Sequence, residues 1–183
     1  MSEELLVRHC SPTLAGLKTG NMFTMPYQSE QSVTDEIRRL NKLMVPKGLR
    51  VLPMRFKKDR VLIYIYRPVK LADDLSDCYA CSLLRKNGYT CIEPNKCIAQ
   101  LIKKLRVEEE FPHEIGLFLG YPPEDVEGFI ENKAENCKFT GVWKVYGDEE
   151  KAKKLFEKYK KCTDVYYYQW SNGKPIERLT VAV

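Results

Sequence analysis

The first third of the chain alternates between helical and strand-like spacing of its apolar residues. Residues 35–44 carry an apolar face at helical spacing, which predicts an amphipathic helix. Before it, Ser11 and Pro12 are typical of a helix start and Gly20 of a helix end, so we expect a short helix between them. Residues 24–32 are polar and show no period, which favours a loop.

Strand-like runs come next. Residues 49–56 and 60–66 are rich in apolar and β-branched side chains, and they predict two strands joined by a tight turn. Pro53 places the first strand at the edge of a sheet, because proline cannot donate a hydrogen bond to a neighbouring strand. Two helices are expected after this hairpin, over residues 72–87 and 94–106, the second with a clear apolar stripe.

The stretch around Gly120 organises the second half of the chain. Residues 115–119 form a short apolar run between turn residues, which indicates a buried strand, and Pro123 suits the first position of a following helix. The elements expected after that helix are a strand over 139–146, a helix over 148–161, a strand over 165–170, a hairpin turn at Asn172–Gly173 and a strand over 176–183. This β-α-β-α-β-β order predicts an α/β (α+β) protein with helices packed on a single mixed β-sheet.

Length and composition predict a single domain over residues 1–183, with residues 1–32 packing on the sheet as an N-terminal segment. Apolar residues make up 44% of the chain and charged residues 30%, which is typical of a folded protein and not of a disordered one. The net charge of +5 permits an acidic partner without requiring one. The aromatic run at residues 166–170 lacks an interleaved basic stripe, so nucleic-acid binding is not favoured.

No apolar run approaches the ~20 residues that span a bilayer. Glu3 and Glu4 precede a very short apolar run at the start of the chain, which excludes a secretory signal of the usual pattern there. We therefore expect a cytoplasmic protein that does not enter a membrane. In that reducing compartment, the seven cysteines are expected to be free thiols.

Four of the cysteines, Cys78, Cys81, Cys91 and Cys97, form a pattern that resembles a tetrahedral zinc site. The first pair, however, lies inside a predicted helix, and the second is divided between a loop and the next helix. Buried free cysteine behaves as a small apolar residue, so core positions are the favoured interpretation. We expect neither a metal nor a cofactor.

Cys10 immediately precedes the predicted helix start, where free N–H groups and the helix dipole favour a thiolate. A nucleophilic cysteine also needs a base within hydrogen-bond reach, and His113, oriented by Glu114 or another carboxylate, is the candidate. In this interpretation an acyl or amide substrate would be positioned by Thr13, Lys18 or Asn21. The alternative is a packed cysteine that anchors the N-terminal segment.

A ligand site is expected between the N-terminal segment and the turn at Gly120–Tyr121. Pro122 and Pro123 offer no N–H there, and Glu124 and Asp125 place negative charge on the helix start, so a neutral or cationic ligand is favoured over a phosphate. The side chains expected to bind it are His9, Thr13, Lys18, Asn21, Glu114 and Tyr121.

Two segments together, HCSPTLAGLK from His9 and FPHEIGLFLGYPPEDV from Phe111, resemble an uncharacterised bacterial family of small soluble proteins, a domain of unknown function. The resemblance runs nearly the whole length and includes residues 141–147. It implies no activity, cofactor or catalytic residue, but it supports treating the chain as one unit.

These patterns favour a cytoplasmic domain that binds a small molecule or a protein partner without catalysis. The alternative function is a cysteine-dependent enzyme that acts on an acyl or amide substrate with Cys10 as nucleophile. Neither the identity of the ligand nor the oligomeric state follows from the sequence.

Overall fold

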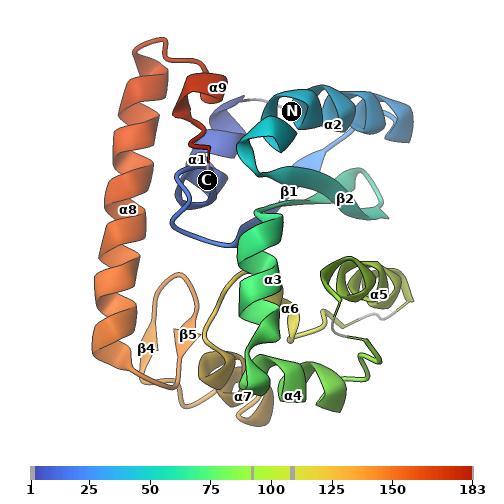
Figure 1. The fold of residues 1–183 in the computed structure, drawn as a ribbon, viewed down its shortest axis with the longest axis vertical. Helices are drawn as coiled ribbons and strands as arrows, with labels where there is room; N and C mark the ends of the chain where they lie inside the picture. The colour runs from blue at the N-terminus through green and yellow to red at the C-terminus, as the bar shows by residue number, and fades with distance from the viewer. Residues whose placement is uncertain (1–2, 92, 108–109, 183) are drawn as a thin grey trace. The chain divides into compact units, whose positions relative to one another are not determined.

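The structure is a computed structural model that describes residues 3–91, 93–107 and 110–182 (Figure 1). The chain divides into two compact units. The sheet unit consists of Met1–Val69 with Tyr159–Val183, and the helical unit consists of Lys70–Lys158. The expectation that residues 1–183 act as one domain stays a prediction.

The sheet unit is built on a three-stranded antiparallel sheet with strand order β1-β3-β2. Its strands are β1 (Gly20–Pro26), β2 (Arg50–Lys57) and β3 (Arg60–Tyr66). The predicted hairpin is confirmed, and Pro53 lies in an edge strand beside a register shift, as its missing N–H requires. The expected loop over 24–32 is wrong at both ends, because residues 24–26 pair with β3 and the next helix begins at Glu30 and not at residue 35.

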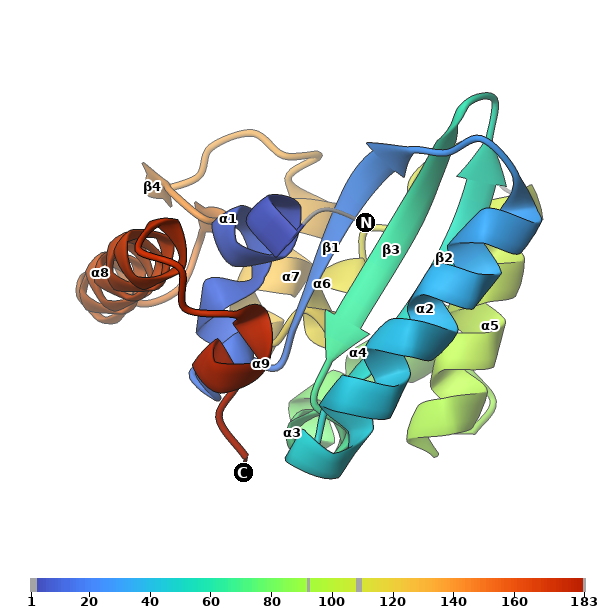
Figure 2. The same ribbon diagram turned by 90° about the horizontal axis from the view of Figure 1, so that it is seen from above.

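Helices cover one face of this sheet. Figure 2 shows α2 lying along the sheet, with Val33, Ile37 and Leu40 buried in the core of the unit. The same core includes Val51, Ile63 and Ile65 from the strands and Ile176 and Leu179 from the C-terminal segment. The helices of the unit are α1 (Glu3–Leu14), α2 (Glu30–Met44), the 3₁₀ turn η1 (Val45–Lys47), the second part of α8 (Glu149–Ser171) and α9 (Ile176–Leu179).

The start of α1 differs from the prediction. The helix begins at Glu3 and not at Ser11, and Pro12 lies inside it near its C-terminal end. Apolar residues at helical spacing from Leu6 to Leu14 are buried and hold the segment helical, which outweighs the backbone hydrogen bond that Pro12 cannot make.

Arg67 joins the segments that meet at the end of β3. Its side chain is buried, and its guanidinium donates to the carbonyl oxygens of Thr13 at 2.8 Å, Leu14 at 2.8 Å, Val181 at 2.8 Å and Lys47 at 3.3 Å. The first two carbonyls end α1, where a cation is favoured by the helix dipole. One buried cation thus satisfies backbone groups from three parts of the unit.

We expect Arg67→Met to lower the free energy of unfolding of the sheet unit by about 3 kcal/mol, because it leaves buried carbonyl groups without donors. Urea unfolding measures this, followed by Trp170 fluorescence in a Trp143→Phe background, since Trp170 belongs to the same unit. Arg60→Met is the matched control, because the Arg60 side chain is exposed and its guanidinium donates to Thr24 on the neighbouring strand. Equal losses in the two variants would contradict the role given to Arg67.

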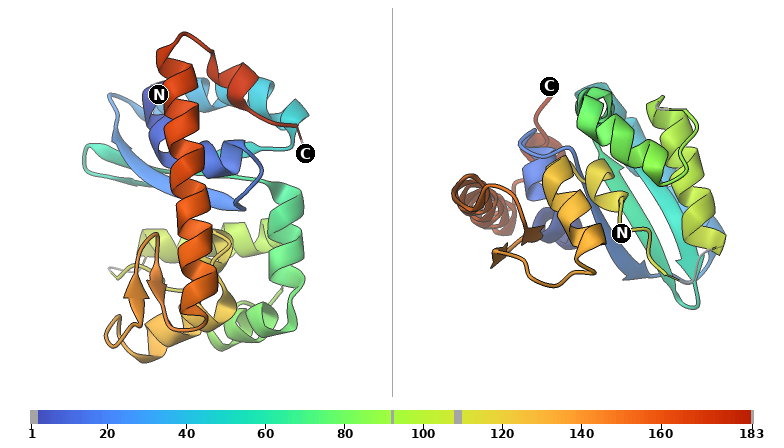
Figure 3. Two further views of the ribbon diagram at one scale, coloured as in Figure 1. Left: turned by 90° about the vertical axis from the view of Figure 1, so that its left-hand side faces the viewer. Right: turned by 90° about the horizontal axis from the view of Figure 1, so that it is seen from below.

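The helical unit holds short elements around a small hairpin. Its elements are α3 (Pro68–Ser76, which starts at the unit boundary), α4 (Cys78–Lys86), α5 (Pro94–Val107), α6 (Ile115–Phe118), α7 (Pro123–Glu131), β4 (Phe139–Thr140), β5 (Lys144–Val145) and the first part of α8. Strands β4 and β5 pair in antiparallel fashion, and this orange hairpin lies beside α7 (Figure 3). The expected helix over 72–87 is divided in two at Asp77, whose carboxylate caps α4.

A buried ion pair fastens α6 to the neighbouring helices. Lys104 on α5 binds the carboxylate of Glu114, which also accepts a hydrogen bond from the Tyr89 hydroxyl at 3.2 Å. The same ammonium donates to the carbonyl oxygen of Asn87 at 3.1 Å. One carboxylate oxygen of Glu114 thus connects α6 to α5 and to Tyr89.

The predicted α/β class is confirmed, whereas the predicted element order is wrong in the second half. Residues 115–118 are helical, residues 165–170 continue α8, and the final segment contains α9 in place of a strand. The single strand expected over 139–146 is instead the β4–β5 hairpin. The expected single mixed sheet is instead two separate antiparallel sheets. Tyr159, Tyr166 and Trp170 recur at helical spacing, so the aromatic run extends the helix, which Figure 3 shows uninterrupted.

Candidate ligand-binding pocket

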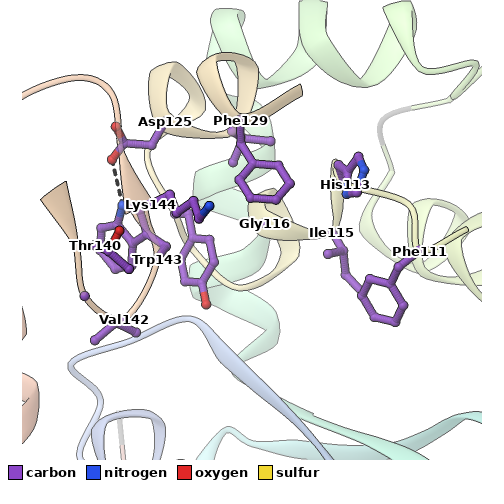
Figure 4. Close-up of a pocket in the computed structure, with 13 residues that line it drawn as sticks. Phe111, His113, Ile115, Gly116, Asp125, Phe129, Thr140, Val142, Trp143 and Lys144 are labelled. Atoms are coloured by element: carbon purple, nitrogen blue, oxygen red, sulfur yellow. Dashed lines mark hydrogen bonds between the residues drawn. The ribbon is translucent and has the colours of Figure 1, made fainter. Parts of the chain in front are cut away.

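A cavity of about 310 Å³ opens in the helical unit between α6, α7 and the β4–β5 hairpin (Figure 4). Its size falls at the lower end of the range for small-molecule sites. Its apolar walls include Phe111, Ile115, Tyr121, Val126, Phe129 and Trp143. The polar side chains that line it are His113, Asp125, Thr140 and Lys144.

The floor of the cavity forms where α6 meets α7. At Gly116 an added Cβ would lie 2.7 Å from Cγ2 of Val126, so this close approach requires glycine. Pro122 precedes α7 and Pro123 opens it, which makes the turn between the helices stiff. Burial raises the pKa of Tyr121 to about 12, so this phenol is neutral at physiological pH.

Asp125 connects α7 to the hairpin. One carboxylate oxygen accepts the indole N–H of Trp143 at 2.7 Å, and the other accepts the backbone N–H groups of Tyr146 and Gly147, each at 2.7 Å. The carboxylate is buried, and three donors surround it. Its charge is thus balanced within the wall of the cavity and sets the position of Trp143.

The hairpin wall is completed by aromatic packing. Trp143 stacks on Tyr121 with ring centroids 4.6 Å apart and meets Phe156 edge-on at 4.5 Å. Gly141, at the hairpin turn, leaves no room for a side chain, because an added Cβ would lie 2.3 Å from the Phe156 ring. These contacts fix one aromatic face of the cavity.

The mouth of the cavity is partly apolar. Phe111 is 40% exposed and Val142 is 44% exposed, so both present apolar surface to solvent at its rim. His113 packs its ring edge-on against Phe129, with centroids 5.1 Å apart. The rim therefore combines an imidazole with apolar side chains.

We expect Asp125→Asn to lower the free energy of unfolding of the helical unit by about 3 kcal/mol. The amide has an NH₂ group in place of one carboxylate oxygen, and this donor would face N–H groups that need an acceptor. Thermal unfolding, followed by Trp143 fluorescence in a Trp170→Phe background, measures the loss. Glu124→Gln is the control, since the neighbouring Glu124 is exposed and carries none of these bonds. A variant as stable as the parent would show that the three bonds do not hold the hairpin.

The structure groups the predicted residues of the N-terminal segment within the sheet unit. Lys18 is buried and donates to the carbonyl oxygen of Gly20 at 2.6 Å, while Thr13 donates to the side chain of Asn21 at 2.8 Å. His9 is exposed and stacks on Phe23, with centroids 5.6 Å apart. Burial lowers the pKa of Lys18 to about 7, and the nearby Cys10 opposes that shift.

Cys10 does not stand at a helix start. It lies inside α1, completely buried, and burial raises the pKa of its thiol, which the charge of Lys18 offsets only in part. The reason for expecting a thiolate there is therefore wrong. The predicted base, His113, belongs to the helical unit, so the pairing of Cys10 with His113 stays a prediction.

We expect Cys10 to resist alkylation by iodoacetamide at pH 7, because its thiol is buried and protonated. Cys78 is exposed and serves as the internal control that labels first. Peptide mass spectrometry of a labelling time course measures both rates. Labelling of Cys10 as fast as that of Cys78 would restore the argument for a nucleophile.

The expected core positions of the four-thiol pattern are confirmed for Cys97, which is buried, whereas Cys81 and Cys91 are half-buried and Cys78 is exposed. Cys81 donates to the carbonyl oxygen of Leu75 at 3.0 Å, and Cys97 donates to that of Cys91 at 3.1 Å. Within the described ranges, no group of three or more histidine, cysteine or acidic side chains is arranged to hold a metal ion.

Of the residues predicted in the helical unit, His113 and Tyr121 line the cavity, whereas Glu114 is held by Lys104. The sequence prediction did not include Phe129, Trp143 or Lys144. The signal available in the sequence was Trp143, one of two tryptophans in the chain, which follows Gly141 by two residues. A helix long and apolar enough to traverse a bilayer does not occur in the described parts of the chain.

The sequence profile of the family described as "Protein of unknown function (DUF3793)" matches residues 6–180. The chain belongs to this family. The match confirms the predicted resemblance to a domain of unknown function and spans both units, so the family includes the sheet unit together with the helical unit. No curated protein and no solved structure matches the chain.

Proposed function

We propose that the helical unit binds a small, largely apolar molecule in the cavity between α6, α7 and the hairpin, without doing chemistry on it. The observation that carries this proposal is the cavity of about 310 Å³ with aromatic walls and few polar groups, an arrangement typical of small-molecule sites. Its walls are fixed by the bonds of Asp125 and by the stacking of Trp143, so the site is formed before a ligand arrives.

The chemistry of the lining residues supports binding over catalysis. The described residues that line this cavity include no cysteine and no serine. The hydroxyl of Thr140 contacts the thiol of Cys137 in the described structure and no basic group. The carboxylate of Asp125 is occupied by three donors and is not available as a base.

A cytoplasmic location is part of the proposal. All seven cysteines are free, and two of them, Cys10 and Cys97, are buried. Free thiols in this number are typical of proteins from a reducing compartment.

The test is a titration with naphthalene-2-carboxamide, a neutral aromatic probe, followed by ligand-observed NMR. A ligand of this size is expected to bind with a Kd on the order of 1 mM. Phe111→Ala should weaken binding by roughly 10-fold, because it removes an aromatic wall at the mouth of the cavity. Since Phe111 is partly exposed, this variant is expected to fold.

Tyr168→Ala is the control, because Tyr168 is an exposed aromatic residue on α8 in the sheet unit. It should leave the Kd unchanged. Failure of naphthalene-2-carboxamide and of its carboxylic acid analogue to bind at all would overturn the proposal, as would equal weakening by the two substitutions.

A further inference from the structure

We infer that the ligand of this cavity carries a carboxylate, bound by the ammonium group of Lys144. This inference rests on the proposed function and specifies the chemical class of the ligand: an apolar body that fits the aromatic walls, with one anionic end. It differs from the neutral or cationic ligand that the sequence favours, because that expectation depended on the charges of Glu124 and Asp125.

The two acidic residues do not set the charge of the cavity. Glu124 is not among the residues that line it, and the carboxylate of Asp125 is surrounded by the N–H groups of Trp143, Tyr146 and Gly147. Because three donors offset its charge, Asp125 offers little attraction to a cation in the cavity. Among the described residues that line the cavity, Lys144 is the one lysine or arginine.

Lys144 is half-buried in β5, at the wall of the cavity. Figure 4 shows its side chain extending from the hairpin in the direction of Phe129. Its ammonium donates to the carbonyl oxygen of Ala134 at 2.5 Å, and the described part of the chain gives it no carboxylate partner. An ammonium has three N–H groups, so two remain for a ligand.

The position of this ammonium is fixed by the segment it contacts. Lys133, Ala134 and Asn136 have left-handed backbone conformations with φ of 49°, 64° and 56°, which is costly for residues other than glycine. Lys144 holds this segment at Ala134, and the Tyr146 hydroxyl donates to the carbonyl oxygen of Glu135 at 3.0 Å. These two hydrogen bonds tie β5 and the residue after it to the segment that follows α7.

A half-buried ammonium beside aromatic walls favours an anionic group and repels a cationic one. A charge-assisted hydrogen bond to a partly buried group is stronger than one at the open surface. A carboxylate satisfies both remaining N–H groups with its two oxygens, while the apolar part of the ligand contacts the rings of Tyr121 and Phe129.

The experiment compares three probes that share one ring system: naphthalene-2-carboxylate, naphthalene-2-carboxamide and 2-naphthylmethylammonium. We expect the carboxylate to bind roughly 10-fold more tightly than the amide, and the ammonium probe more weakly than both. Lys144→Met should abolish the preference, so that the carboxylate and the amide bind this variant with equal affinity.

Lys138→Met is the matched control. Lys138 lies in the same hairpin region and also donates to one backbone carbonyl, that of Gly147 at 2.7 Å, but it does not line the cavity. This control should keep the tenfold preference. If Lys144→Met binds none of the three probes, Lys144→Arg is measured in its place, since it retains the charge. In Lys144→Arg a retained preference for the carboxylate supports the inference, and a lost preference contradicts it.

The possible failures are distinguishable. Equal affinity of the parent protein for the carboxylate and the amide would overturn the carboxylate assignment and leave the proposed function standing. No binding of any of the three probes would overturn the proposed function itself. Tighter binding of the ammonium probe than of the carboxylate would show that Lys144 does not determine the charge of the ligand.

Discussion

The buried carboxylate of Asp125 is the interaction on which the cavity depends. It sits in the first turn of α7 and accepts the indole N–H of Trp143 together with two backbone N–H groups that follow the hairpin. The strands of that hairpin are two residues long, too short to be stable by their own pairing. The hairpin is therefore held against α7 chiefly by this carboxylate and by aromatic stacking, and the space left between them is the site.

A similar arrangement supports the sheet unit. Arg67 is a buried cation surrounded by carbonyl groups, as Asp125 is a buried anion surrounded by N–H groups. In both cases uncharged dipoles surround the charge in place of an opposite charge: backbone carbonyls at Arg67, and two backbone N–H groups with one indole N–H at Asp125. This arrangement fixes chain segments in place without pairing two ionisable side chains. In the helical unit Asp125 is bound by N–H groups, and Lys144 has no carboxylate partner in the described structure.

The spacing of apolar residues predicted the helices and strands whose period is clear within one segment. It failed where the same residues are compatible with a helix and with a strand. The sequence predicted the hairpin over 49–66, its edge proline and the apolar stripe of α5, because strand and helix periods are distinct in these segments. Residues 115–119 are too short for a period to show, and the tyrosines of α8 were assigned to a strand by their β propensity although their spacing is helical. The cavity could not be predicted, because it depends on Asp125 meeting a hairpin some twenty residues further along the chain.

The most direct test of the account is the indole N–H signal of Trp143 in a ¹H–¹⁵N spectrum during a titration with naphthalene-2-carboxylate. The chain has two tryptophans, Trp143 in the helical unit and Trp170 in the sheet unit, so a Trp170→Phe variant assigns the signals. The account predicts that the Trp143 signal shifts in a saturable way while that of Trp170 stays in place. A Trp143 signal that does not move, or two indole signals that move together, would contradict it.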